Sequence, residues 1–330
     1  MTSALHPAPL DLDGGNPRPV LQAAADAART GRAAALAVVL QTEGSSYSRA
    51  GTCALFEPGR QVGWLSGGCL EPELARQAAN AVDAGRIAWM EIDSRDDAAL
   101  FSGNATGCRG RQWLALLPLP QLGGIEQLLD AWLQGPHTLH LALQADGRLD
   151  ARCAGFTFTR TVPPAALQPL DGSHRWRLQW HRSPVVHVHG AGPEAALLLP
   201  LLDQLGWCAH VEEPRPRWRE HLPLAAGSYC SSAAAGVADA ALVMHHNFEL
   251  DRDALQRLAD SRVPFIGLLG PRRRKDDLFS VLDTRTRLAL EPRLRSPIGL
   301  PLGGRGPEAI ALSVAAQLQA WRHGTPLATP

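Results

Sequence analysis

The stretch from Gly63 to Glu71, Gly-Trp-Leu-Ser-Gly-Gly-Cys-Leu-Glu, places a thiol among small residues. The glycines leave room for backbone N–H groups to approach a ligand, and Cys69 is a soft nucleophile or metal ligand. Apolar side chains recur at helical spacing through residues 70–86, so Cys69 lies at the expected N-terminus of a helix. That position favours a thiolate and binds anions such as phosphate. The sequence therefore predicts a site here; the alternative is a tight turn that holds a buried, inert cysteine.

Two further stretches have a similar character. Residues 104–110 contain Gly107 and Cys108, a second glycine-flanked thiol that lies 39 residues after the first. This spacing does not fit a structural zinc site, which uses closely spaced pairs of cysteine or histidine. Residues 43–51 combine hydroxyls, glycines and Arg49, a set that suits phosphate recognition, although an ordinary polar turn explains this stretch more simply.

The composition indicates a globular chain whose partners are small molecules or other proteins. With 330 residues, 45% hydrophobic and 19% charged, the chain is long enough for two domains with separate cores. Its formal net charge is zero, which argues against nucleic acid or an acidic membrane surface as a partner. The start of the chain lacks the pattern of a signal peptide, and no apolar run reaches about 18 residues, so we expect a cytoplasmic protein. The six cysteines are scattered, and we expect reduced thiols.

The first half of the chain mixes helical and strand patterns. The expected helices cover residues 16–29, 70–86 and 123–133, and the expected strands cover residues 35–40, 113–117, 139–143 and 154–160, with turns at 57–60 and 145–147. The proline-rich stretch 162–173 is typical of a linker. We therefore expect a mixed α/β domain over residues 1–170 and a second domain over residues 171–330.

The second half opens with the pattern of a dinucleotide-binding βαβ unit. An expected strand at residues 185–189 is followed by Gly190, Gly192 and Ala195 in a Gly-x-Gly-x-x-Ala turn, and then by a helix and another strand. The two glycines would let the pyrophosphate of NAD(P) approach the backbone closely.

Glu213 completes this pattern, because an acidic residue at this distance accepts hydrogen bonds from a ribose 2′-hydroxyl and disfavours a 2′-phosphate. Pro193 and Glu194 fit poorly beside a pyrophosphate, since the first removes an N–H donor and the second adds negative charge. A Rossmann scaffold without a cofactor is the alternative.

Alternating patterns continue to the end of the chain. Strands are expected at residues 241–244 and 265–269, and helices at residues 251–260 and 307–321. Together with the first unit they predict a doubly wound parallel sheet. His246 lies at the carboxyl end of an expected strand, the edge at which such sheets bind ligands, and is a functional candidate. We interpret the other histidines near these strands, His187, His189 and His245, as residues at the edge of the core.

These motifs, taken in order, resemble the XdhC/CoxI family of accessory proteins for xanthine dehydrogenase and related molybdenum hydroxylases. The motifs that carry the resemblance are Glu43-Gly-Ser…Gly51, Gly63-x-Leu-Ser-Gly-Gly-Cys69-x-Glu71, Gly107-Cys108-x-Gly110, Gly190-Ala-Gly192, Glu213-Pro-Arg-Pro216, Phe265-Ile-Gly267-x-x-Gly270 and Pro297-Ile-Gly299-Leu…Pro307-Glu308. They span nearly the whole chain and imply an XdhC/CoxI-type N-terminal domain followed by a Rossmann-like domain. The chain departs from the family pattern at Tyr47-Ser48-Arg49, at Arg109 and at His245-His246-Asn247.

The resemblance implies a protein that binds molybdenum cofactor, shields it, assists its sulfuration by a cysteine desulfurase and hands it to an apo molybdenum hydroxylase. Such a protein would not itself turn over a substrate. Molybdenum favours soft ligands, so Cys69 is a candidate metal ligand, while Cys108 is a second ligand, a sulfur relay or a structural thiol. The candidate cofactor-binding residues are Gly44, Ser45, Arg49, Ser66, Gly67, Gly68, Cys69, Glu71, Gly107, Cys108, Gly190, Gly192, Glu213 and His246.

Two other functions remain open from the sequence. An NAD-dependent oxidoreductase would use the Rossmann-like domain for hydride transfer, with Cys69 or His246 in the chemistry, but no catalytic acid/base set is recognisable. A scaffold protein would dock a hydroxylase without holding any cofactor. A homodimer would be unsurprising in each case.

Overall fold

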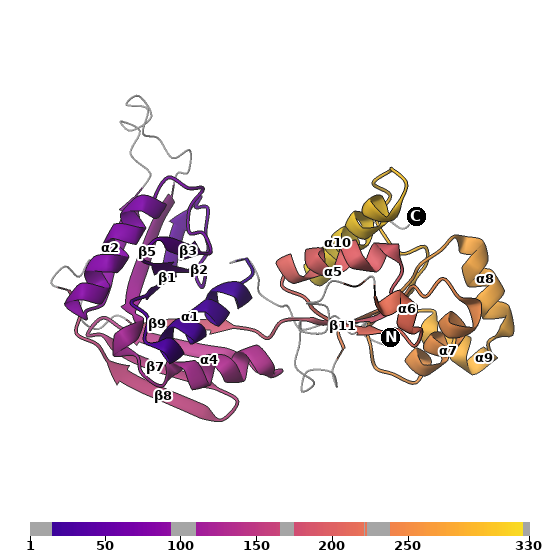
Figure 1. The fold of residues 1–330 in the computed structure, drawn as a ribbon, viewed down its shortest axis with the longest axis horizontal. Coiled ribbons are helices and arrows are strands. Elements are labelled where there is room, and N and C mark those ends of the chain that lie inside the picture. The colour runs from indigo at the N-terminus through magenta and orange to yellow at the C-terminus, as the bar shows by residue number, and fades with distance from the viewer. Residues whose placement is uncertain (1–14, 94–109, 166–174, 221, 223–237, 326–330) are drawn as a thin grey trace. The chain divides into compact units, whose positions relative to one another are not determined.

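A computed structural model describes residues 15–93, 110–165, 175–220, 222 and 238–325 of the chain (Figure 1). The chain divides into two compact units. The first comprises Asp11–Arg182, and the second includes Ser183–Pro330. No helix in the described ranges is both long enough and apolar enough to cross a membrane.

The first unit is built on a five-stranded antiparallel sheet in the order β3-β2-β1-β5-β4. Its strands are β1 (Ala35–Gly44), β2 (Cys53–Glu57), β3 (Arg60–Val62), β4 (Ala88–Asp93) and β5 (Gly110–Pro118). The predicted turn at residues 57–60 joins β2 to β3. β4 has no counterpart among the predicted strands, because it is a half-exposed edge strand without a buried apolar run.

A second, four-stranded antiparallel sheet completes this unit in the order β8-β7-β6-β9. Its strands are β6 (Leu139–Gln144), β7 (Arg148–Cys153), β8 (Phe156–Thr161) and β9 (Arg175–Trp180). The turn at residues 145–147 leads into β7, which has no counterpart among the predicted strands. The predicted strand at residues 154–160 corresponds to β8, which follows β7. β9 was not predicted either, although buried and exposed residues alternate strictly along it.

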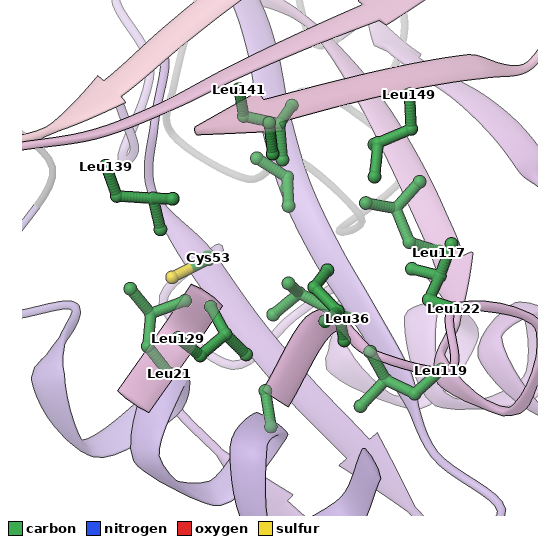
Figure 2. Close-up of a cluster of buried hydrophobic side chains, with 14 of the residues drawn as sticks. Leu21, Leu36, Cys53, Leu117, Leu119, Leu122, Leu129, Leu139, Leu141 and Leu149 are labelled. Atoms are coloured by element: carbon green, nitrogen blue, oxygen red, sulfur yellow. The ribbon is translucent and has the colours of Figure 1, made fainter. Parts of the chain in front are cut away.

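One core fills the space between the two sheets. Helices α1 (Arg18–Thr30) and α4 (Ile125–Gln134), with the short 3₁₀ helix η1 (Leu119–Gln121), pack into it. Figure 2 shows Leu21 of α1, Leu36 of β1 and Leu129 of α4 in this cluster, together with Leu141 of β6. The indole of Trp132 donates a buried hydrogen bond of 2.9 Å to the carbonyl of Trp180, which fastens α4 to the four-stranded sheet.

Helix α2 (Glu71–Ala84) covers the opposite face of the five-stranded sheet. Successive side chains of a strand point to opposite faces. Leu36 and Val38 of β1 therefore enter the first core, while Ala37 and Val39 pack in a separate cluster with Leu74 of α2. Both faces of β1 are buried, and α2 is held with its N-terminus directly after the Cys69 segment.

The second unit is a parallel sheet in the order β11-β10-β12-β13-β14. Its strands are β10 (Val185–His189), β11 (Cys208–Glu212), β12 (Ala240–Val243), β13 (Phe265–Leu268) and β14 (Leu294–Arg295). Helices α5 (Pro193–Gln204) and α10 (Pro307–Arg322) pack on one face, and α7 (Phe248–Ala259), α8 (Arg272–Val281) and α9 (Thr284–Leu290) on the other. The short helix α6 (Pro216–Arg219) follows β11. This architecture confirms the predicted Rossmann-like doubly wound sheet.

The cysteines differ in state. Cys53, Cys69 and Cys153 are free thiols, whereas Cys208 is disulfide-bonded, so the expectation of reduced thiols is wrong for Cys208. Spacing along a chain does not determine which thiols the fold brings together. Burial raises the pKa of Cys53 to about 12, which keeps this thiol protonated and inert.

The turn between β6 and β7 offers a test of the four-stranded sheet. Gly147 has φ +89°, and a Cβ atom there would lie 1.9 Å from the carbonyl oxygen of Val162. Gly155 has φ +85° with open space around it, so both positions carry the same conformational penalty but only Gly147 carries a clash. We expect Gly147→Ala to lower the free energy of unfolding by about 2 kcal/mol more than Gly155→Ala. Urea denaturation of both variants measures this difference, and equal losses would contradict the described turn.

Candidate functional site

The segment between β3 and α2 is organised by one buried carboxylate. Glu71, 5% exposed, accepts hydrogen bonds from the backbone N–H of Leu65 at 3.1 Å and of Ser66 at 2.8 Å, and from the Ser66 hydroxyl. Burial alone would raise the pKa of Glu71, but the Ser66 hydroxyl and these backbone N–H groups outweigh burial and lower it. Glu71 therefore holds the loop as an anion, folded back from the first turn of α2.

The Ser66 hydroxyl also fixes the backbone around Cys69. Its oxygen accepts hydrogen bonds from the backbone N–H of Gly68 at 3.2 Å and of Leu70 at 3.1 Å, and the Cys69 sulfur lies 3.6 Å from it. The Cys69 side chain is exposed, so the alternative of a buried cysteine does not apply. The backbone N–H groups of Gly67 and Cys69 have no acceptor among the described residues and are available to an anion.

The structure brings another of the predicted stretches, residues 43–51, to the same place. The Ser48 hydroxyl is buried and donates a 2.6 Å hydrogen bond to the carbonyl of Leu65. Gly44 pairs with Gly110, and a Cβ atom on Gly110 would lie 2.4 Å from the carbonyl oxygen of Ser45. Residues 44–49 thus join the Cys69 loop to the start of β5. Gly107 and Cys108, in the third predicted stretch, lie outside the residues that the structure describes, which resume at Gly110.

In the second unit, the predicted residues gather at the carboxyl ends of β10 and β12. The sheet order reverses between these strands, which is where open α/β sheets bind ligands. Gly190 has φ +122°, and a Cβ atom there would lie 2.5 Å from the Met244 backbone. A Cβ atom on Gly192 would meet the side chains of Glu194 and His246, whose Oε2 and Nε2 atoms are 3.0 Å apart. Both glycines are therefore already required by contacts within the unit.

Glu213 already accepts hydrogen bonds within the second unit, so a dinucleotide would have to compete with them. Its buried carboxylate accepts hydrogen bonds from the backbone N–H of Ala191 at 3.1 Å, and from the backbone N–H, Nε and Nη2 of Arg215 at 3.0, 2.7 and 2.8 Å. Burial opposes ionisation, but the Arg215 and Ala191 hydrogen bonds outweigh it and lower the pKa of Glu213 to about 2. A ribose hydroxyl would have to displace one of these donors, and the Ala191 N–H that would meet a pyrophosphate is occupied.

Several histidines extend across the same sheet. Ring centroids are 5.6 Å apart for His187 and His210, and 6.3 Å apart for His189 and His245. His245 Nδ1 lies 3.1 Å from Asp251 Oδ1. Among the described residues, no group of three or more His, Cys, Asp or Glu side chains is arranged to hold a metal ion.

Models of known families match both units. The model described as "XdhC and CoxI family" matches residues 27–93, which include the Cys69 loop, and the model described as "XdhC Rossmann domain" matches residues 186–318. The chain belongs to the XdhC and CoxI family. Residues 104–110 lie between the two matched ranges.

Relatives of this XdhC/CoxI-family chain match along most of its length. A probable xanthine dehydrogenase subunit of Bacillus subtilis is 27% identical over an alignment of 322 positions, gaps included, which covers 86% of this chain and 92% of that protein. The molybdenum cofactor insertion chaperone PaoD of Escherichia coli is 24% identical over an alignment of 319 positions, which covers 92% of this chain and 88% of that protein. A crystal structure described as a xanthine dehydrogenase from Bacillus halodurans shares the fold, with a TM-score of 0.72, 23% identity, and 94% and 97% of the two chains covered.

Two exposed aromatic residues beside the Cys69 loop of this family member were not among the predicted site residues. The side chains of Tyr47 and Trp64 are 61% and 60% exposed, and each directly precedes one partner of the hydrogen bond between Ser48 and Leu65. Arg49 is also exposed and forms no salt bridge with any described residue. Aromatic residues inside a glycine-rich motif are the signal that could have identified this pair.

The loop of this XdhC/CoxI-family chain should depend on the charge of Glu71. In Glu71→Gln an amide NH₂ replaces one oxygen and faces the donors of Ser66 and Leu65, so we expect a loss of about 2 kcal/mol in the free energy of unfolding. We also expect faster alkylation of Cys69, measured by mass spectrometry of its peptide. Glu73→Gln is the matched control, because Glu73 is exposed and pairs with side chains on α2. Equal effects of the two variants would contradict the assignment.

The histidines predict a pH dependence of the second unit. Burial, partly offset by Glu212, lowers the pKa of His189 from 6.5 to about 4. The unfolded chain therefore binds a proton before the folded chain does, so stability that is complete above pH 6.5 is lost as the pH falls towards 4, by about 3 kcal/mol in total. His189→Gln should show a shallower loss in urea denaturation between these pH values. His323→Gln, at the exposed end of α10, should follow the wild type, and identical slopes for all three proteins would refute the prediction.

Proposed function

We propose that this chain binds molybdenum cofactor as a cargo and delivers it to an apo molybdenum hydroxylase of the xanthine dehydrogenase type. The observation that carries the proposal is the exposed Cys69 thiol on a loop that the buried carboxylate of Glu71 keeps in shape. The names of the two relatives support it, since one is a molybdenum cofactor insertion chaperone and the other a probable xanthine dehydrogenase subunit.

The residues at this loop suit the chemistry of such a cargo. Molybdenum accepts soft thiolate ligands, and Cys69 would bind it through sulfur. The cargo also carries a phosphate, for which the available N–H groups of Gly67 and Cys69 and the exposed guanidinium of Arg49 are suitable partners. Ser66 and Glu71 would not touch the cargo; they hold the loop that binds it.

Sulfuration and release require partners. We include a cysteine desulfurase as the sulfur donor, with Cys108 as a further ligand or relay for sulfur, and a homodimer as the assembly. Because a carrier must release its cargo, we expect binding through few protein ligands and an open site, in keeping with the exposure of Cys69.

An NAD-dependent oxidoreductase remains the second candidate because the Gly190–Gly192 turn and Glu213 have the arrangement of a Rossmann unit. Binding of NAD in the usual way would require a ribose hydroxyl to replace the hydrogen bond from Arg215 or from Ala191 at the Glu213 carboxylate. A carrier has no such requirement, because Glu213 then serves to brace the turn.

Retention of pterin distinguishes these functions. The protein is purified anaerobically from cells that make the cofactor, and bound pterin is oxidised to its fluorescent derivative and quantified. We expect pterin with the wild type and at least a tenfold loss in Cys69→Ala, since a metal–thiolate bond is removed. Cys153→Ala is the control, because this thiol is buried in the first core.

The outcomes separate the three candidates. Equal retention by wild type and Cys69→Ala would remove Cys69 from the site. Absence of pterin from the wild type, under conditions in which a known carrier retains it, would overturn the carrier proposal. Binding of NAD by the same preparation would then favour the oxidoreductase, and binding of neither would favour a scaffold.

A further inference from the structure

The outward face of the four-stranded sheet is basic, a feature that the proposed carrier function does not use. Side chains alternate between the core and solvent along β7 and β9, and each outward position carries a charged or polar group. The cations on this face are Arg148, Arg152, Arg175 and Arg177. Asp150 is the acidic residue at the outward positions of these two strands.

This face is hollowed over β6. The hollow has a volume of about 580 Å³, within the range of pockets for small molecules. Ala142 is one of its lining residues and lies opposite Asp150 on β7 and Arg177 on β9. The short side chain of Ala142 leaves a depression between longer neighbours on both adjacent strands.

The charges around the hollow are not balanced. Asp150 is occupied by Arg148, at 3.2 Å, by Arg175, at 3.8 Å, and by the hydroxyl of Thr159, at 3.0 Å. Arg152 and Arg177, by contrast, form no salt bridge with any residue that the structure describes. These two arginines lie on the strands on either side of β6, and their positions differ by two residues along the strands. Their backbones are therefore about 12 Å apart, so the two long side chains can reach one anion between them.

Polar groups without charge complete the lining. His140 lies opposite Arg152 and Gln179 on the neighbouring strands. Burial and the charge of Arg152 lower the pKa of His140, so the imidazole is neutral and offers a donor and an acceptor. Thr157, opposite Arg152 on β8, adds a hydroxyl. Guanidinium groups with hydroxyl and imidazole donors form the set that recognises a phosphate dianion.

We propose that this hollow binds a small organic molecule through a phosphate monoester, which Arg152 and Arg177 hold from opposite sides of β6. The organic part would lie over Ala142. The site is formed by the sheet face that points away from the core, whereas α2 and the Cys69 loop cover the far side of the five-stranded sheet, so the two sites are separate.

Calorimetric titration of the full chain with phenyl phosphate tests this site. We expect saturable binding by the wild type, no binding of phenol, and a loss of about tenfold in affinity for Arg152→Gln and for Arg177→Gln, the effect of one charge-assisted contact. Ala142→Leu should also weaken binding about tenfold, because it fills the hollow and leaves every charge in place. Arg273→Gln is the control, since it removes one exposed arginine from the second unit and should bind as the wild type does.

Several results would overturn the proposal. Absence of saturable binding by the wild type, or unchanged affinity in Arg152→Gln, Arg177→Gln and Ala142→Leu, would do so. A loss in Arg273→Gln as large as in Arg177→Gln would show attraction to net charge without a site. Tighter binding of hexaglutamate than of phenyl phosphate, lost in the same variants, would assign the face to an acidic protein segment.

Discussion

The loop that carries Cys69 depends on the burial of a single carboxylate. An ionised side chain is costly to remove from water unless hydrogen bonds replace its hydration. Glu71 receives that replacement from the N–H groups of Leu65 and Ser66 and from the Ser66 hydroxyl, all within the segment that precedes it. The loop therefore closes on its own following helix, and Ser48 fastens it to the end of β1. A thiol can be exposed here without its backbone being loose.

In the second unit, too, a buried glutamate holds a glycine-containing turn. Glu213 accepts a hydrogen bond from Ala191, inside a glycine-containing turn, and Arg215 then connects the carboxylate to the backbone of His245, which follows the neighbouring strand. In both units a buried glutamate takes the N–H groups of a glycine-rich turn that could otherwise bind an external anion. The two turns differ in which N–H groups remain available: those of Gly67 and Cys69 have no described acceptor, whereas the Ala191 N–H is occupied.

Elements with a clear periodicity or glycine spacing in their own sequence could be predicted from the sequence alone. Helix α2, the parallel strand β10 and the turn at Gly190 followed from periodicity and glycine spacing. The fold class followed as well, but the edge strand β4 did not, because its pairing with β5 is decided by distant residues. The role of Glu71 could not be predicted from its position alone. A carboxylate in a first helical turn normally faces solvent and the helix dipole. The burial of Glu71 and its hydrogen bonds from Leu65 and Ser66 show that this one turns inward.

The exposure of Cys69 also has a chemical cost for the cell. The exposed Cys69 thiol is open to peroxide, whereas Cys53 is protected by its burial and by its pKa of about 12. Oxidation of Cys69 to a sulfenic acid would remove the soft sulfur donor and add an oxygen beside the Ser66 hydroxyl. Under the proposed carrier function, the amount of protein able to take up cargo would therefore depend on the balance between thiol reductants and oxidants.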